Sequence, residues 1–144
     1  MNLSGLIELV ASEPTISELM DAARAGSRAT LDVAMPEAMR PPVAAALAGP
    51  RPLLLVTSTY REAETLASSL DSLLGPDAVA YYPAWETLPH ERLSPRSDTV
   101  GRRLEVLRRL AGNDELPAPR VVVAPVRSVL HPQVKGLGEL LPVS

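Results

Sequence analysis

The sequence predicts an α/β fold, in which a parallel sheet is flanked by helices. Short apolar runs of strand length alternate with longer amphipathic stretches along the chain. Strict alternation of strands and helices favours parallel pairing through right-handed crossovers, with helices on both faces of the sheet. The chain has 144 residues, which is enough for one domain with a single core.

Residues 1–27 predict a helical extension ahead of the sheet. Two short helices, Leu3 to Val10 and Thr15 to Ala25, are separated by Pro14, and Gly26 ends the second. We expect this hairpin to cover one edge of the sheet.

Residues 28–144 are expected to form the α/β lobe itself. A weak first strand over Arg28 to Ala34 precedes a helix over Val43 to Ala48, which Pro42 is well placed to open. The next strand, Leu53 to Thr57, is a continuous apolar run. Such a run is typical of a strand that is buried on both faces.

A long amphipathic helix follows this strand. Thr59 and Glu62 have the spacing of a capping box, and Gly75 is expected to end the helix. The third strand covers Ala78 to Tyr82 and the fourth covers Arg120 to Val126. Because an open sheet usually has more than four strands, we expect later residues to complete this one.

The helix between the last two strands is predicted to begin at a cap formed by Ser97 or Asp98. Its apolar residues are expected to face inward and its arginines outward, the two sets being Val100, Leu104, Leu107 and Leu110, and Arg102, Arg103, Arg108 and Arg109. A solvated helix face is favoured over a track for DNA phosphates, because Glu105 is spaced for ion pairs within the helix.

Composition argues against several kinds of site. There is no cysteine and there are only two histidines, far apart, so neither a disulfide framework nor a metal site is expected. The net charge of −3 disfavours DNA binding over the whole surface. The basic residues are nearly all Arg, which suits a local phosphate or carboxylate site, although GC-rich codon usage explains the same bias. With no basic leader and no membrane-length apolar run, the sequence predicts a cytosolic protein with no membrane contact.

The segment that follows the first predicted strand is a degenerate phosphate-binding loop, made of Met35, Pro36, Glu37, Ala38, Met39 and Arg40. A working loop needs glycines, whose backbone N–H groups close around the anion, and a lysine for the outer phosphates. This one has no glycine and no lysine, and Glu37 repels phosphate. The sequence therefore predicts no cofactor site here, and it shows no catalytic or metal-binding group elsewhere in the segment.

The stretch from Tyr81 to Asp98 is the strongest candidate for a functional surface. It holds the only Trp of the chain together with prolines that favour an ordered loop. The predicted contact surface consists of Trp85, Glu86, Arg92, Arg96, Arg102 and Arg103. Two alternatives remain open: Trp85 as a purely structural anchor, and Glu86, His90 and Glu91 as the acid–base groups of an unrelated small α/β enzyme.

The same stretch carries a family resemblance. The run Tyr82-Pro83-Ala84-Trp85-Glu86-Thr87-Leu88-Pro89, then Leu93-Ser94-Pro95 and Asp98 with Arg102-Arg103-Leu104, resembles the N-terminal UvrB-like region of the bacterial transcription-repair coupling factors (Mfd). The resemblance covers roughly residues 29–130. It implies a lobe similar to the first lobe of the excision-repair protein UvrB, itself a RecA-like helicase lobe, with Met39 or Arg40 in place of the essential P-loop lysine. The damage-probing tyrosines of UvrB have no counterpart between Pro83 and Asp98.

The resemblance also implies a role for the longer parent protein. Proteins of this family are ATP-dependent DNA translocases that displace stalled RNA polymerase at lesions and recruit UvrA for nucleotide excision repair. The resemblance implies that ATP and Mg bind the motor domains of the parent, and that RNA polymerase and double-stranded DNA bind other domains of it. It implies that UvrA binds mainly the domain that follows this segment. The segment itself is expected to be a non-catalytic module. The alternative is an active motor lobe that binds nucleotide.

Overall fold

The computed structural model describes residues 4–26, 30–49, 51–75, 77–85 and 96–140. Within these ranges the elements are, in order, α1 (Ser4–Ala11), α2 (Pro14–Arg24), η1 (Glu37–Met39), α3 (Arg40–Leu47), β1 (Leu53–Thr57), α4 (Tyr60–Leu74), β2 (Val79–Tyr81), α5 (Ser97–Ala111), β3 (Val121–Pro125), α6 (Val126–Leu130) and η2 (Leu137–Glu139). Here η marks a short 3-10 helix.

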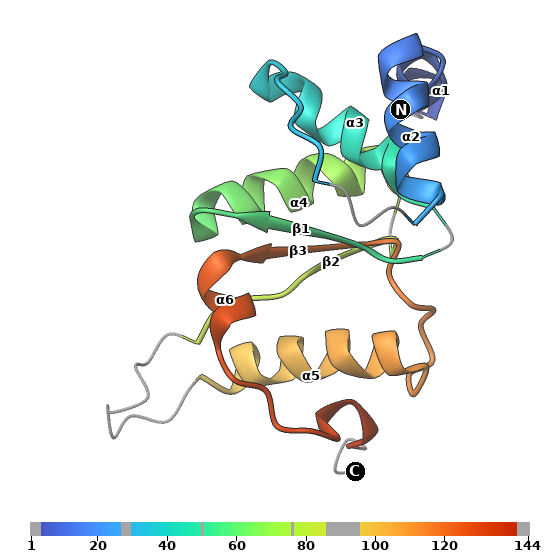
Figure 1. Ribbon diagram of the computed structural model, residues 1–144. Coiled ribbons are helices and arrows are strands. Elements are labelled where there is room, and N and C mark those ends of the chain that lie inside the picture. Colours follow the sequence, from blue (N-terminus) through green and yellow to red (C-terminus); the bar gives the residue numbers. More distant parts are fainter. Residues whose placement is uncertain (1–3, 27–29, 50, 76, 86–95, 141–144) are drawn as a thin grey trace.

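The described strands form one parallel sheet in the order β1-β3-β2. Helices α3 and α4 lie on one face of this sheet and α5 lies on the other (Figure 1). The predicted α/β fold, a parallel sheet flanked by helices, is confirmed. The arrangement is consistent with part of a RecA-like or UvrB-like lobe.

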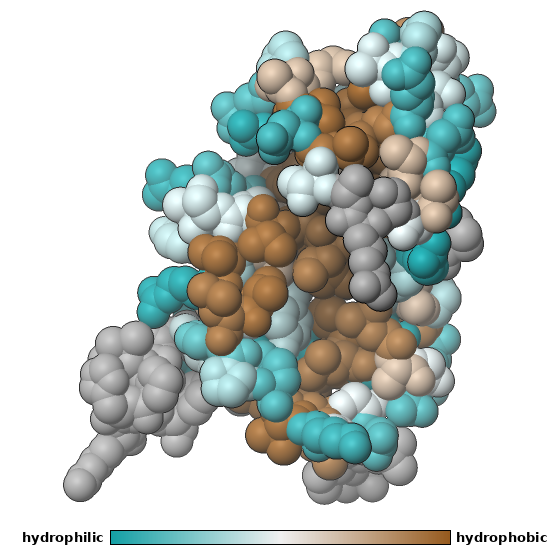
Figure 2. Space-filling model, in the orientation of Figure 1, coloured by the Kyte–Doolittle hydropathy of each residue, from teal (hydrophilic) through white to brown (hydrophobic). Residues whose placement is uncertain are grey.

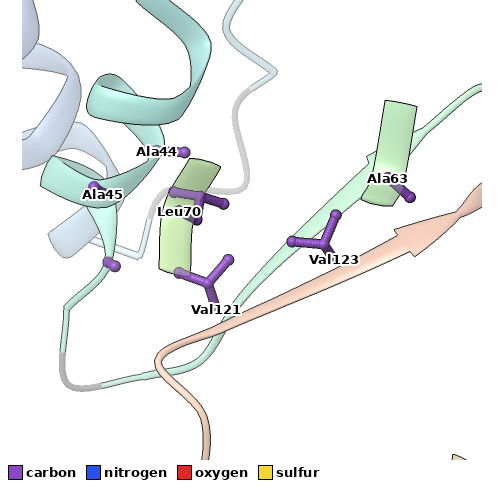
Figure 3. Close-up of a cluster of buried hydrophobic side chains, with 7 residues drawn as sticks. Ala44, Ala45, Ala63, Leu70, Val121 and Val123 are labelled. Carbon is purple, nitrogen blue, oxygen red and sulfur yellow. The ribbon is translucent and has the colours of Figure 1, made fainter. Parts of the chain in front are cut away.

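The core is divided between the two faces of β3, whose residues are all buried. On the face of α3 and α4, Val121 and Val123 pack against Leu70 and small alanine side chains of both helices (Figure 3). On the other face, Val106 of α5 packs against alternate residues of the sheet, namely Ala80, Tyr82, Val122 and Ala124. The small alanine side chains let α3 pack closely on α4, and α4 packs on the sheet.

Local sequence signals account for α4. The Thr59 hydroxyl accepts a hydrogen bond from the Glu62 N–H, and the Glu62 carboxylate accepts one from the Thr59 N–H, both at 3.2 Å. The predicted capping box is therefore confirmed, and Gly75 is the C-cap as expected. By contrast, the N-cap of α5 is Arg96, one residue before the predicted candidates, and its side chain makes no capping bond.

The prediction of a first strand over Arg28 to Ala34 is wrong where the structure describes it, since residues 30–36 form neither helix nor strand. An extended segment gains stability only when a neighbouring strand completes its hydrogen-bond ladder. The following helix begins at Arg40 rather than Val43, with proline in its first turn. The N-terminal helices pack on α3 instead of covering a sheet edge.

The burial of β1 also differs from expectation. Leu53 and Leu55 pack on the core, but Leu54 and Val56 are 53% and 49% exposed. They are exposed because β1 is an outer strand of the described sheet. The apolar run predicts burial on both faces of β1, but within the described residues only the face of Leu53 and Leu55 is covered.

The outward placement of all four α5 arginines is wrong for two of them. Arg103 and Arg109 are buried, whereas Leu110, predicted to face inward, is exposed. Arg109 donates from Nε to the Pro117 carbonyl at 3.0 Å and also to the Asp77 carbonyl. Long guanidinium side chains are buried here because loop carbonyls accept their hydrogen bonds.

A candidate contact surface at the carboxyl ends of the strands

The segments that follow the three strands meet in one pocket. Its volume is about 580 Å³, and its walls come from the end of β1, the end of β2, the first turns of α5 and the end of β3: Ser58, Thr59, Tyr60, Glu64, Tyr81, Pro83, Ala84, Trp85, Asp98, Thr99, Arg102, Pro125 and Arg127. In α/β sheets this is the edge at which ligands and partners bind.

The wall after β1 is fixed by hydrogen bonds of the turn into α4. The Thr57 hydroxyl donates to the Thr59 carbonyl at 2.8 Å, and the Ser58 hydroxyl donates to the Glu62 carboxylate at 2.6 Å. The bond from Ser58 is the main cause that lowers the pKa of Glu62 below its usual value of 4.5. Ser58 therefore donates to a carboxylate whose lowered pKa makes it a weak base for activating a serine nucleophile.

The wall after β2 is held by a buried guanidinium. Arg103 is 1% exposed and lies between two aromatic rings, with its guanidinium carbon 4.1 Å from the Tyr82 ring centroid and 4.3 Å from that of Trp85. It also donates from Nη1 to the Pro83 carbonyl at 2.5 Å. These contacts tie α5 to the residues that leave β2, so Trp85 is fixed by its stacking on Arg103.

The electrostatics of this stack follow from its burial. Burial lowers the pKa of Arg103, while the adjacent Tyr82 opposes that shift. Burial likewise raises the pKa of Tyr82 above 10.0, against the effect of Arg103. No partner among the described residues accepts from Nε or Nη2 of Arg103.

The lining of the pocket carries both signs of charge. Burial raises the pKa of the Tyr81 phenol above 10.0, Glu64 adds to that shift and Arg102 opposes it. Asp98 lies 3.4 Å from Arg96 in an ion pair at the surface. A pocket with aromatic rings, two carboxylates and two guanidinium groups suits a mixed protein surface better than a polyanion.

The predicted contact residues have different outcomes. Trp85 and Arg102 line the pocket and Arg103 stacks on Trp85 behind it, so the structure brings these three together. Arg96 lies at the start of α5 but not among the lining residues. Glu86 and Arg92 lie outside the described residues, as do His90 and Glu91 of the alternative enzyme hypothesis.

The predicted contact residues leave out most of the pocket lining, including four large side chains: Tyr60, Glu64, Tyr81 and Arg127. Three of them had a signal, since Tyr60, Tyr81 and Arg127 lie at or just after the ends of strands. Glu64 had none, because it reaches the pocket only through the packing of α4 beside β2.

The degenerate loop lies apart from this pocket. Met35 and Pro36 precede η1, Arg40 opens α3, and none of the six loop residues lines the pocket. Arg40 is the only cation of the loop, and its Nη1 lies 3.9 Å from the Glu37 carboxylate. Across the described ranges, no three His, Cys, Asp or Glu side chains gather as a metal site. No helix in those ranges is long and apolar enough to cross a membrane.

Comparison with known proteins identifies relatives of the whole chain. No protein-family model matches it. The transcription-repair-coupling factors of Mycobacterium bovis and Mycobacterium tuberculosis are each 51% identical to it over 146 residues, which is 99% of this chain and 12% of each relative. The resemblance carried by the Trp85 stretch is therefore confirmed: over nearly its whole length, the chain is related to one part of the transcription-repair-coupling factors.

Proposed function

We propose that this chain is a non-catalytic, UvrB-like module of a cytoplasmic transcription-repair coupling factor. The parent protein would be an ATP-dependent DNA translocase that displaces stalled RNA polymerase at lesions and recruits UvrA for nucleotide excision repair. The relatives support the repair context through their name, and the chain spans only 12% of their length.

The non-catalytic role rests on one observation, the chemistry of the segment that enters α3. A triphosphate needs several free N–H groups at a helix start. Here Pro36 precedes η1, and Pro41 and Pro42 occupy the first turn of α3, so three positions have no N–H to donate. The nearby Glu37 carboxylate repels a phosphate and also lies within ion-pair distance of Arg40. ATP and Mg would instead bind the motor domains of the parent.

The pocket at the carboxyl ends of the strands would then serve as a contact surface for protein. Its fixed aromatic residue, Trp85, has the character of a binding hot spot, and the charges around it provide orientation. RNA polymerase and double-stranded DNA would bind other domains, and UvrA would bind mainly through the domain that follows this one.

Calorimetric titration with ATP and Mg tests the non-catalytic role. We expect no saturable heat with the 144-residue chain up to millimolar nucleotide, whereas the full-length factor should bind. An affinity in the micromolar range that Arg40→Ala abolishes would instead favour an active motor lobe.

A pull-down of UvrA tests the placement of that partner. We expect weak capture by this chain and strong capture by a version extended through the next domain of the parent. Equal capture by the two would place the main contact within these 144 residues and contradict the proposal.

A further inference from the structure

Two arginines of the pocket lining have no carboxylate partner among the described residues. Arg102 on α5 and Arg127 on α6 are both exposed, and both line the pocket at the carboxyl ends of the strands. The ion pairs within the described ranges use five other arginines: Arg24, Arg40, Arg96, Arg108 and Arg109. A guanidinium group presents its donors in a fixed plane, which suits a carboxylate held by two hydrogen bonds. The pocket therefore offers two cationic groups that the described carboxylates leave unpaired.

The lining carries an excess of positive charge once its ion pair is counted. Of its two carboxylates, Asp98 already pairs with Arg96 at 3.4 Å, whereas Glu64 has no cation within ion-pair distance in the described part of the chain. Two guanidinium groups therefore face one free carboxylate, which leaves one positive charge. Burial is the main cause that raises the pKa of Tyr81, Glu64 adds to that shift and Arg102 opposes it, so both charges act on the aromatic part of the pocket.

An aromatic wall lies beside these charges. Trp85 is held by its stacking on Arg103, and Tyr60 and Tyr81 line the same pocket. The volume of about 580 Å³ is that of a site for a small ligand or for a few residues of a peptide. Figure 2 shows hydrophilic surface beside hydrophobic patches along the left edge of the molecule, where β1 and β3 end. A complementary ligand combines an apolar side chain with a charge.

We propose that this pocket binds an acidic peptide segment of a separate partner protein, with a carboxylate on Arg102 and Arg127 and an apolar side chain on Trp85. The inference rests on the proposed function, which assigns the pocket to protein contacts, and it adds the chemistry of the partner. A bound carboxylate would give both guanidinium groups charge-assisted hydrogen bonds. Exposed charges of this kind select the partner and speed its association.

The charges of the lining disfavour other occupants. A basic segment would place its cations against both guanidinium groups. Nucleic acid is disfavoured because Glu64 and Asp98 repel a run of phosphates, and a single excess positive charge neutralises few of them. A permanently packed segment of the same parent protein is disfavoured because permanent interfaces are more apolar than this lining.

Fluorescence anisotropy of a rhodamine-labelled peptide tests the proposal in the full-length factor. The probe is Gly-Glu-Leu-Asp-Leu-Glu-Gly, and its neutral match has Gln and Asn in place of Glu and Asp. We expect saturable binding of the acidic probe, at least about tenfold tighter than that of the neutral probe. No saturable binding of the acidic probe, or equal binding of the two, would overturn the proposal.

Single variants of the full-length factor locate the binding. Arg102→Gln and Arg127→Gln should each weaken the acidic probe at least about fivefold, because each removes one charged partner. Arg61→Gln is the matched control, since Arg61 is an exposed arginine of α4 outside the pocket lining and should leave the affinity unchanged. Glu64→Gln should raise the affinity, because Glu64 repels the probe. Full affinity in both Arg102→Gln and Arg127→Gln, or a loss with Glu64→Gln, would overturn the assignment to this pocket.

The same assay separates a failure of this inference from a failure of the proposed function. Tighter binding of the neutral probe, lost in Arg102→Gln, would overturn the acidic partner but leave the pocket a protein-contact surface. Binding of a labelled oligothymidine that depends on both Arg102 and Arg127, with no binding of either peptide, would contradict both proposals.

Discussion

The stack of Arg103 between Tyr82 and Trp85 should contribute strongly to stability. In Arg103→Ala, the two ring contacts at 4.1 and 4.3 Å are lost, at about 0.5–2 kcal/mol each. The charged hydrogen bond to the Pro83 carbonyl adds about 1.5–3 kcal/mol. Part of this loss is offset, because the substitution also removes a buried charge whose Nε and Nη2 have no hydrogen-bond partner within the described part of the chain. We expect a net decrease of about 2–4 kcal/mol in the free energy of unfolding.

Urea denaturation monitored by tryptophan fluorescence measures this change well. Trp85 is the only tryptophan, so its emission reports the stack itself, and circular dichroism follows the whole fold. Arg102→Ala is the matched control, since Arg102 is the exposed neighbour on the same helix and should change the free energy by less than about 0.5 kcal/mol. Arg103→Met keeps an unbranched side chain without the charge and should fall between the parent and Arg103→Ala. An Arg103→Ala variant within about 0.5 kcal/mol of the parent would refute the reasoning.

Three further outcomes are expected. Thr59→Ala removes the cap of α4 and should cost about 1 kcal/mol in urea denaturation, while the exposed mid-helix Thr65→Ala should not destabilise; equal effects would contradict the capping account. Stability should fall as pH rises above about 10, because burial raises the pKa of Tyr82 in the folded chain and the unfolded chain ionises first. Tyr82→Phe should make that alkaline loss shallower in melts between pH 9 and 11, and an unchanged slope would exclude Tyr82 as a source. Gly101→Ala should raise the melting temperature through roughly 0.5–1 kcal/mol of helix propensity, since a Cβ there meets no atom within 4 Å. Gly138→Ala should lower the melting temperature, because the added Cβ would lie 2.8 Å from the Leu107 carbonyl oxygen. A higher melting temperature for Gly138→Ala would show that η2 does not pack on α5 as described.

The sequence by itself determined several local elements and the similarity to the coupling factors. The apolar run Leu53–Thr57, the Thr59 and Glu62 cap and the helix end at Gly75 are confirmed, because each depends on residues close together in the chain. The Trp85 stretch carried the relationship to the coupling factors for the same reason: its residues are contiguous and specific. The sequence also named the stretch from Tyr81 to Asp98 as the candidate surface, and two of the predicted contact residues, Trp85 and Arg102, line the pocket.

Only the tertiary structure decided which side chains are buried and which of the predicted residues meet. Helical periodicity assigns a charged residue to the outside, but Arg103 and Arg109 find rings and carbonyls at distant positions and are buried. The same periodicity could not show that, among the described residues, β1 has a strand neighbour on one side only, or that residues 30–36 join no strand. Burial and pairing depend on partners far away in sequence, and a local pattern records the preference of a residue without recording whether its partner is present.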